Sequence, residues 1–443
     1  MTFMSGKRIF SFIIVFVFCT GVARSQQMIT LEEAIAATLK NNYDILLAEN
    51  DSAAAAIDKK YIFGGFLPTV NGTLGRTQTT SAQKQEFDGR PEVEGKGIRS
   101  RNLSAAINLN LVLFDGLKMF ATRDRINELF ALGQINLKNQ VINSTAAVIN
   151  AYYIIVRQKQ QLKAIDEQMS INEERVKLAD RKLSVGLGTK PELLQAKVDL
   201  NAQKATRLQQ QSIMAQSKEQ LNQLTGMQLP EPFEVSDSIP IKDDMTIENI
   251  QNNIQSTSPA ILLALKNVDI SRIMLKEVKA TRWPVISFGS AYNFTQNNNY
   301  NNINPYAAIF SSNKGFNFGF TASVPILNYM NVNRNIKQAQ LDVTYQETAL
   351  KQQKNAVDVL VKAGFYNYQY QVSLLKLEEE NIQLAKENVS IALERFKLGV
   401  STFLELREAQ KSLEDAYDRL IAARYNTKLS ETELLRLKGE LVK

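Results

Sequence analysis

The chain has 443 residues, of which 52 are Lys or Arg and 45 are Asp or Glu, and it contains no histidine and a single cysteine. The commonest general base and the usual zinc ligands are therefore missing, so we predict a protein that is not an enzyme and that holds no cofactor or metal. The basic residues behind the formal net charge of +7 are interleaved with acids, which is typical of a solvated surface and does not favour nucleic acid as a partner.

The N-terminus carries the features of a secretory signal peptide over residues 1–25. Lys7 and Arg8 precede an apolar run that ends at Cys19, and Ala23-Arg24-Ser25 is a small-x-small cleavage site. The bulky Val17-Phe18 before Cys19 is wrong for a lipoprotein signal, so lipidation is not expected. We expect the mature chain to start at Gln26, in a compartment outside the cytoplasm.

The mature sequence is an internal duplication. Residues 26–226 and 247–443 align with an offset of about 213 to 216 residues, which brings Pro68 onto Pro284 and Gly186 onto Gly399. Each repeat reads as a helix, two strands and two long helices. A stretch rich in proline and acid, residues 227–246, reads as the linker between the repeats.

Segments that alternate with period two predict two strands per repeat. They lie at about residues 68–80, 101–113, 284–296 and 314–326. In the last segment Phe316, Phe318 and Phe320 share one face. The alternation alone fits a half-buried strand of a soluble sandwich equally well. Only four such strands are found and long polar loops at 81–100 and 296–313 join each pair, so we favour transmembrane strands.

Long stretches without proline predict the main helices. They cover residues 116–185, 190–225, 329–398 and 402–438. A helix of about 70 residues spans roughly 100 Å, far more than a globular core requires.

Two apolar seams run along the helix at 329–398, each with seven-residue spacing. One seam contains Leu375, Ile382, Val389 and Phe396, and the other contains Leu377, Leu384, Ile391 and Leu398. An offset of two residues places the seams about 200° apart, so the helix is apolar on two opposite flanks. Such a helix needs a neighbour on each side, as a stave does in a hollow barrel.

Four transmembrane strands cannot close on themselves. Unpaired backbone groups in hydrocarbon cost several kcal/mol each, and the smallest outer-membrane barrels need about eight strands. Several copies must therefore pool their strands. We predict a mainly α fold with a small transmembrane β part, in which three copies give a twelve-stranded β-barrel and an α-helical barrel.

The chain resembles the TolC-like outer-membrane efflux protein family, whose members are also called outer membrane factors. The strand-exit motif of the family corresponds to Val112-Leu113-Phe114-Asp115-Gly116 and to Pro325-Ile326-Leu327-Asn328-Tyr329, although the first copy lacks the proline and the second lacks Phe-Asp-Gly. The helix-turn motif stands at Arg395-Phe396-Lys397-Leu398-Gly399. The resemblance covers both repeats.

The resemblance implies a homotrimeric channel in the bacterial outer membrane that extends into the periplasm. Such a channel is the passive exit duct of a tripartite efflux or type I secretion system. Its partners would be outer-membrane lipid, a periplasmic adaptor (membrane fusion) protein and an inner-membrane transporter.

The resemblance also implies roles for residues at the two helix turns. In the family these turns form the periplasmic entrance and contact the adaptor, and acids just beyond the turn glycine surround the constriction. The implied gate candidates are Glu192, Gln195, Phe396, Ser401, Glu405 and Glu408, and the implied adaptor-contact tips are Val185, Gly186, Leu187, Leu398, Gly399 and Val400. Phe396 and Ser401 stand where the family often has a bonded tyrosine and arginine, so the same latch is not expected.

Simpler interpretations stay open. Glu405 and Glu408 are also residues that the dipole favours at a helix start, and Gly186 and Gly399 suit a helix C-cap whatever the function. The alternative for the whole chain is a passive structural or adhesive coiled-coil protein of the envelope, which needs only one apolar seam and no lipid-facing strands. A carboxylate-based hydrolase has no positive support, and the sequence does not identify the transported substrate.

Overall fold

The computed structural model describes residues 27–441 except 231, 243–244, 301–302 and 304–305. The predicted signal peptide at 1–25, with Cys19, lies outside the described residues. The described chain divides into two compact units: a helical unit of residues 27–51, 135–262 and 352–441, and a sheet unit of residues 52–134 and 263–351.

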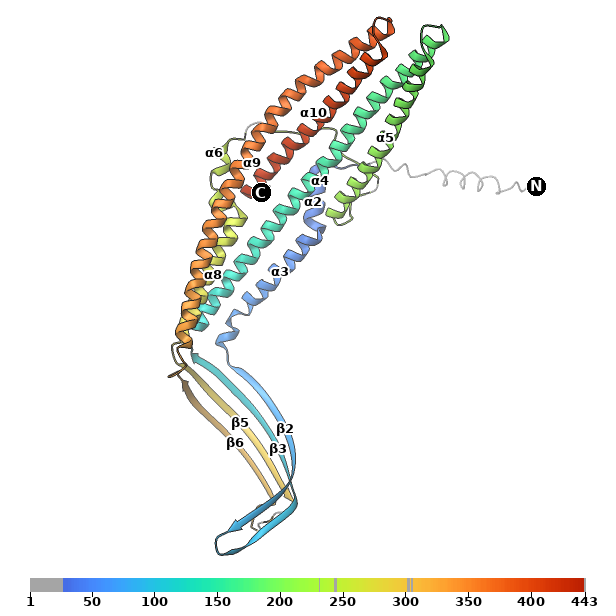
Figure 1. Ribbon diagram of the computed structural model, residues 1–443. Coiled ribbons are helices and arrows are strands. Elements are labelled where there is room, and N and C mark those ends of the chain that lie inside the picture. The colour runs from blue at the N-terminus through green and yellow to red at the C-terminus, as the bar shows by residue number, and fades with distance from the viewer. Residues whose placement is uncertain (1–26, 231, 243–244, 301–302, 304–305, 442–443) are drawn as a thin grey trace, which may run out of the picture. The chain divides into compact units, whose positions relative to one another are not determined.

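The sheet unit contains one antiparallel sheet in the strand order β2-β3-β5-β6 (Figure 1). The strands are β2 (Thr69–Phe87), β3 (Arg90–Phe114), β5 (Val285–Tyr300) and β6 (Phe310–Ser323). The register places Ile107 opposite Tyr292 and Phe288 opposite Phe320. Among the described strands, β2 and β6 each have a pairing neighbour on one side only, so both edges of the sheet are open.

Residues 81–100, expected as an outer loop, form a two-stranded ribbon. β2 and β3 keep pairing up to Phe87 and Arg90, and the chain reverses at Asp88-Gly89, where Gly89 has φ +71°. A cross-strand ion pair joins Lys84 to Glu92 at 2.7 Å. The ribbon extends beyond the last pair between β3 and β5, Arg99 with Tyr300. An Asp-Gly turn favours such a hairpin, although neither face of the ribbon is apolar.

The second expected loop, 296–313, is shorter than the sequence suggested. β5 continues to Tyr300 and β6 begins at Phe310, because the Asn-rich end of β5 still finds partners on both sides. At the other end β6 stops at Ser323, before Pro325, which has no N–H for the ladder.

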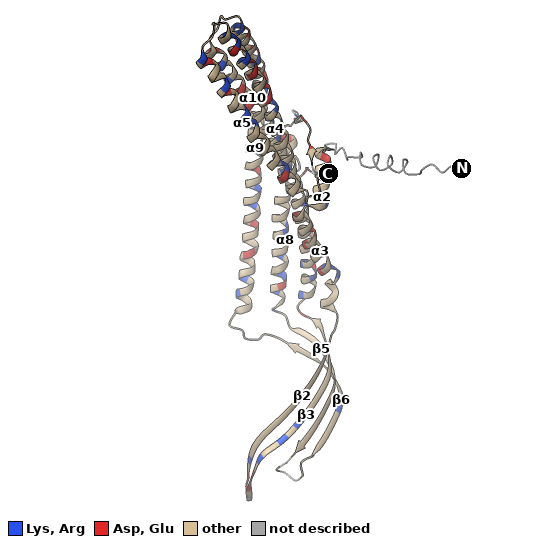
Figure 2. Ribbon diagram, turned by 90° about the vertical axis from the view of Figure 1, so that its right-hand side faces the viewer, with Lys and Arg blue, Asp and Glu red and all other residues tan. Residues whose placement is uncertain are grey.

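Large apolar side chains of the sheet face solvent in a single chain. Leu74, Phe316, Phe318 and Phe320 are 66 to 80% exposed. Figure 2 shows that the strands contain few charged residues apart from the ribbon, whereas acidic and basic residues are mixed along the helices. An exposed, uncharged apolar surface of this kind marks a face that is covered by lipid or by another chain. None of the described helices combines the length and the apolar composition that a membrane crossing requires.

Helices make up the rest of the structure. They are α2 (Leu31–Asn41), α3 (Tyr43–Lys60), the 3-10 helix η1 (Ile62–Phe66), α4 (Lys118–Ser184), α5 (Lys190–Leu224), α6 (Ile247–Gln251), α7 (Ile254–Thr257), α8 (Pro259–Ala280), α9 (Asn331–Lys397) and α10 (Phe403–Lys438). Both α4 and α9 have 67 residues, which corresponds to about 100 Å of helix.

The closing glycines of the two repeats have equivalent surroundings. Gly226 and Gly439 both adopt positive φ, and a Cβ atom at either would lie 2.5 Å from the carbonyl oxygen of Asn41 or 2.6 Å from that of Thr257. Any larger residue would clash with backbone at these points. Each repeat therefore closes by packing its last turn on the end of its own short opening helix.

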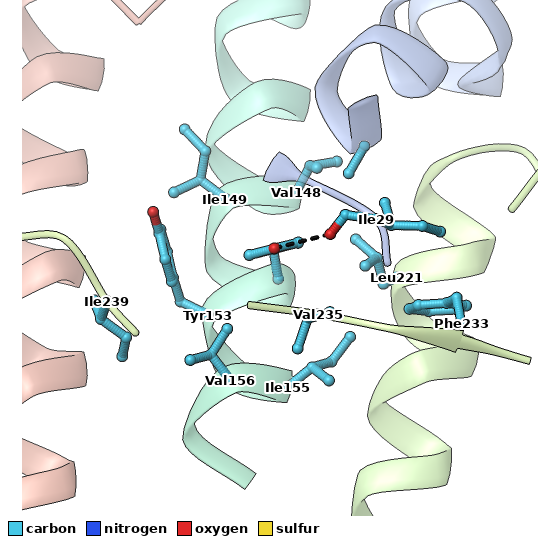
Figure 3. Close-up of a cluster of buried hydrophobic side chains, with 12 residues drawn as sticks. Ile29, Val148, Ile149, Tyr153, Ile155, Val156, Leu221, Phe233, Val235 and Ile239 are labelled. Carbon is cyan, nitrogen blue, oxygen red and sulfur yellow. Dashed lines mark hydrogen bonds between the residues drawn. The ribbon is translucent and has the colours of Figure 1, made fainter. Parts of the chain in front are cut away.

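The largest apolar cluster of the helical unit joins α4, α5 and the linker (Figure 3). The short strands β1 (Gln27–Met28) and β4 (Phe233–Glu234) pair in parallel. The buried Tyr152 hydroxyl donates to the carbonyl oxygen of Ile29 at 3.0 Å and accepts from the N–H of Ser236 at 3.2 Å. Part of the predicted linker is therefore packed into the core instead of lying free on the surface.

The two seams of α9 have opposite environments in one chain. Leu375, Ile382, Val389 and Phe396 are buried, mostly in a cluster with Ala409, Leu413, Ala416 and Leu420 of α10. Leu377, Leu384 and Ile391 of the other seam are 52 to 65% exposed. One apolar flank of α9 is thus buried against α10, and the opposite flank is not covered by any of the described residues.

Candidate functional site at the helix turns

The turn between α4 and α5 is a glycine C-cap followed by a capping box. Gly186 has φ +77°, and the N–H groups of Leu187 and Gly188 donate to the carbonyl oxygen of Lys182 at 2.8 and 3.0 Å. Thr189 and Glu192 then exchange side-chain to backbone hydrogen bonds, both at 3.4 Å. Glu192 therefore has a local role, and the apolar Val185 and Leu187 stay exposed.

The turn between α9 and α10 follows the same design with one difference. Gly399 has φ +77°, the N–H of Val400 donates to the carbonyl oxygen of Arg395 at 3.0 Å, and Thr402 caps the N–H of Glu405 at 3.2 Å. Here the acid at the third helical position does not complete a capping box. The Glu405 carboxylate is thus not engaged at the helix start as Glu192 is, and Leu398 and Val400 project as exposed apolar tips.

A groove of about 450 Å³ between α9 and α10 brings three of the gate candidates together. Ser401, Glu405 and Glu408 line it, with Arg395 on the opposite helix. The two carboxylates are three residues apart on one exposed helix face, where they are available to cations.

The other gate candidates have their side chains engaged elsewhere. The Gln195 amide donates to Asp199 at 2.9 Å. Phe396 is 4% exposed, and its ring packs edge-on against Phe403 at 6.4 Å between centroids. Lys182 lies over the Phe396 ring at 3.9 Å and donates to its carbonyl oxygen at 2.7 Å. Within one chain Phe396 is a packing residue that ties the second turn to α4.

Sequence reasoning missed Arg175, the most buried cation of this region. Its guanidinium is 1% exposed and donates to Asp199 of α5 at 2.5 Å and to Gln410 of α10 at 2.6 Å. It also lies 4.9 Å from the centroid of the Phe403 ring. Burial lowers the pKa of Arg175 below its usual value, and the neighbouring Asp199 carboxylate offsets only part of this effect. Arg175 thus connects the first repeat to the second.

No group of three or more Asp, Glu, His or Cys side chains among the described residues is arranged to hold a metal ion. The chemistry that the turns offer is cation attraction at Glu405 and Glu408 and apolar contact at the four exposed tips.

Comparison with known proteins identifies relatives along nearly the whole length. Residues 34–227 and 251–440 match the family model of outer membrane efflux proteins. The outer membrane protein TolC of Salmonella enteritidis is 20% identical over 356 residues, which cover 79% of this chain and 71% of that protein. The probable efflux pump outer membrane protein TtgC of Pseudomonas putida is 21% identical over 425 residues, or 92% and 82% of the two chains.

Solved structures share the fold. The CmeC outer membrane channel of Campylobacter jejuni has a TM-score of 0.75 at 16% identity and covers 93% of this chain and 86% of its own. The MtrE outer membrane channel of Neisseria gonorrhoeae has a TM-score of 0.70 at 14% identity, with 93% and 89% coverage. These matches confirm the predicted resemblance and the mainly α fold with a four-stranded sheet.

Proposed function

Because the chain belongs to the outer membrane efflux protein family, we propose that three copies of it form one exit duct of a tripartite efflux or type I secretion system. Members of the family are outer-membrane channels and not enzymes, and this chain is an outer-membrane efflux channel. Channels of this type work as homotrimers with an adaptor and an inner-membrane pump. The duct conducts passively, and the pump supplies the energy.

The observation that carries the proposal is that the sheet of one protomer is incomplete. It ends in two unpaired edge strands, β2 and β6, and large apolar side chains on it are exposed to solvent. Such a sheet is stable in lipid only when every edge is paired. Pairing β6 of one copy with β2 of the next closes a twelve-stranded barrel from three copies.

The helices of one protomer likewise leave apolar surface uncovered, on α5 and on α9. Arg207 of α5 binds Asp166 of α4 at 2.7 Å, Tyr417 of α10 binds Glu167 of α4, and α10 packs on α9. These contacts join α4 to both α5 and α10, and α10 to α9, while Arg407 of α10 also reaches Asp199 of α5 at 3.5 Å. Leu194, Val198 and Leu208 are exposed on α5, and the second seam of α9 is exposed as well. Contact between α9 of one copy and α5 of the next would cover both and close the helical barrel.

The turns then lie at the entrance of the duct. Threefold symmetry would turn Glu405 and Glu408 into rings of three carboxylates, which attract cations. The exposed apolar residues Val185, Leu187, Leu398 and Val400 would meet the adaptor. Gly186 and Gly399 both have φ +77°, a conformation that other residues rarely adopt, so glycine suits these tight turns.

Conductance of the purified full-length protein in planar lipid bilayers tests the proposal directly. We expect detergent-solubilised particles with the mass of three copies and discrete single-channel steps. A monomer that binds no detergent and carries no current would refute the proposal and leave a passive structural role.

A further inference from the structure

A polar cavity of about 170 Å³, partly open to solvent, lies between α4, α5 and α10 of the helical unit. Gln168 and Arg175 reach it from α4, Gln203 from α5 and Gln410 from α10. Gln168, Asn172, Arg175 and Gln410, which all line the cavity, are each at most 6% exposed. Polar side chains buried to this degree normally have hydrogen-bond partners.

The free hydrogen-bonding groups of this cavity are mainly donors. Arg175 Nε, Gln168 Nε2 and Gln410 Nε2 are buried N–H groups without a hydrogen-bond partner among the described residues, and Gln203 Oε1 is the one acceptor in the same condition. The orientation of the Gln410 amide is fixed, because its Oε1 accepts from Arg175 at 2.6 Å. A buried donor without a partner destabilises the folded protein, so a ligand that only accepts hydrogen bonds is favoured.

The charged side chains around the cavity are paired with one another. Arg175, Arg407 and Lys411 line it on the cationic side, against Asp199 and Glu414 on the anionic side. Asp199 is shared by Arg175 at 2.5 Å and Arg407 at 3.5 Å, and Glu414 pairs with Lys411 at 3.3 Å. Lys411 also pairs with Asp415 at 3.0 Å, so the charges at the cavity are balanced within ion pairs. The free N–H groups therefore decide which ligand is favoured, and a cation would meet these N–H groups.

We propose that this cavity binds one small monovalent inorganic anion of the halide type. Three donors from both repeats would coordinate it: Gln168 and Arg175 from α4 and Gln410 from α10. The volume is large enough for a halide with a few waters, each of which occupies about 30 Å³. The bound anion ties α4 to α10 and so adds to the contact between the two repeats within one protomer.

Chloride NMR tests the proposal on the detergent-solubilised full-length protein, because a site that exchanges chloride broadens the quadrupolar 35Cl line. We expect saturable broadening that bromide displaces. Gln410→Leu should weaken binding about tenfold, as the loss of one hydrogen bond to a charged ligand predicts. Gln209→Leu, at an exposed position of α5, is the matched control and should leave binding unchanged.

Gln410→Glu keeps the proposal testable if the leucine variant folds poorly. Its carboxylate can still accept from Arg175 but places a negative charge in the cavity, so it should abolish the broadening while the protein stays folded. Crystals grown in bromide should show one anomalous peak in the cavity of the wild type. Water alone at that position, or broadening that survives Gln410→Glu, would overturn the assignment. Neither readout requires conductance, so the result is independent of the proposed exit-duct role.

Discussion

The open seam of α9 makes the sharpest prediction, because it separates assembly from the stability of one chain. Changing Leu377, Leu384 and Ile391 to Ser should weaken the trimer and leave the fold of the protomer intact. These side chains are 52 to 65% exposed in a single chain, so they contribute little to its own core.

The magnitude follows from the area that a neighbouring copy would cover. Full burial of a Leu or Ile side chain stabilises by about 1.5 to 3 kcal/mol, so covering the exposed half to two thirds contributes about 1 to 2 kcal/mol per residue. Three residues give roughly 3 to 6 kcal/mol for each contact between copies, or more than about a hundredfold in its association constant.

The assay is the fraction of trimer on dilution in detergent, measured by native mass spectrometry. The matched control changes Gln383, Lys386 and Glu387 to Ser, which are exposed on the same helix and carry a similar loss of helix propensity. If the seam variant dissociates only at the same protein concentration as the control variant, no copy packs on this seam, and the proposed ring would then be wrong.

Three further predictions concern the turns and the core. Glu405→Gln combined with Glu408→Gln should reduce block of single-channel current by polyvalent cations at least severalfold, because the rings lose their charge; unchanged block would remove these acids from the entrance. Val400→Trp should abolish efflux in cells while trimers still form, and normal efflux would contradict an adaptor contact at this tip. Burial, together with Tyr152 and Glu431, raises the pKa of Tyr153 to about 12 from its usual 10.0. The stabilisation from the neutral phenol is therefore complete below pH 10 and is lost as the pH rises towards 12. The denaturant midpoint of Tyr153→Phe should accordingly change less between pH 10 and 12 than the midpoint of the wild type, and identical pH profiles for the two proteins would contradict this.

Much of the fold could be predicted because the relevant signals are local in sequence. The seven-residue spacing of Leu375, Ile382 and Val389 indicates a packed helix flank without reference to any other segment. Phe316, Phe318 and Phe320 indicate a strand in the same way. The glycine C-caps at Gly186 and Gly399 also follow from local sequence.

The features that sequence reasoning missed depend on residues far apart or on polar pairing. Arg175 bonds with Gln410, which lies 235 positions away, and its own neighbours give no sign of burial. The ribbon at 81–100 is polar on both faces, so hydrophobic periodicity cannot detect it. For Phe396 the seam pattern predicts packing and the family resemblance suggests a gate role, and the structure buries its ring against Phe403 and Lys182.

The ribbon has a practical consequence for experiments. Beyond the Arg99–Tyr300 pair, β2 and β3 form their ladder only with each other, and the reversal at Asp88-Gly89 is remote from every hydrogen bond shared with β5. An epitope or a fluorophore-binding peptide inserted between those two residues extends a hairpin that already ends in solvent. Each molecule of the assembly would then display one such tag, which offers a handle for counting copies and for surface labelling.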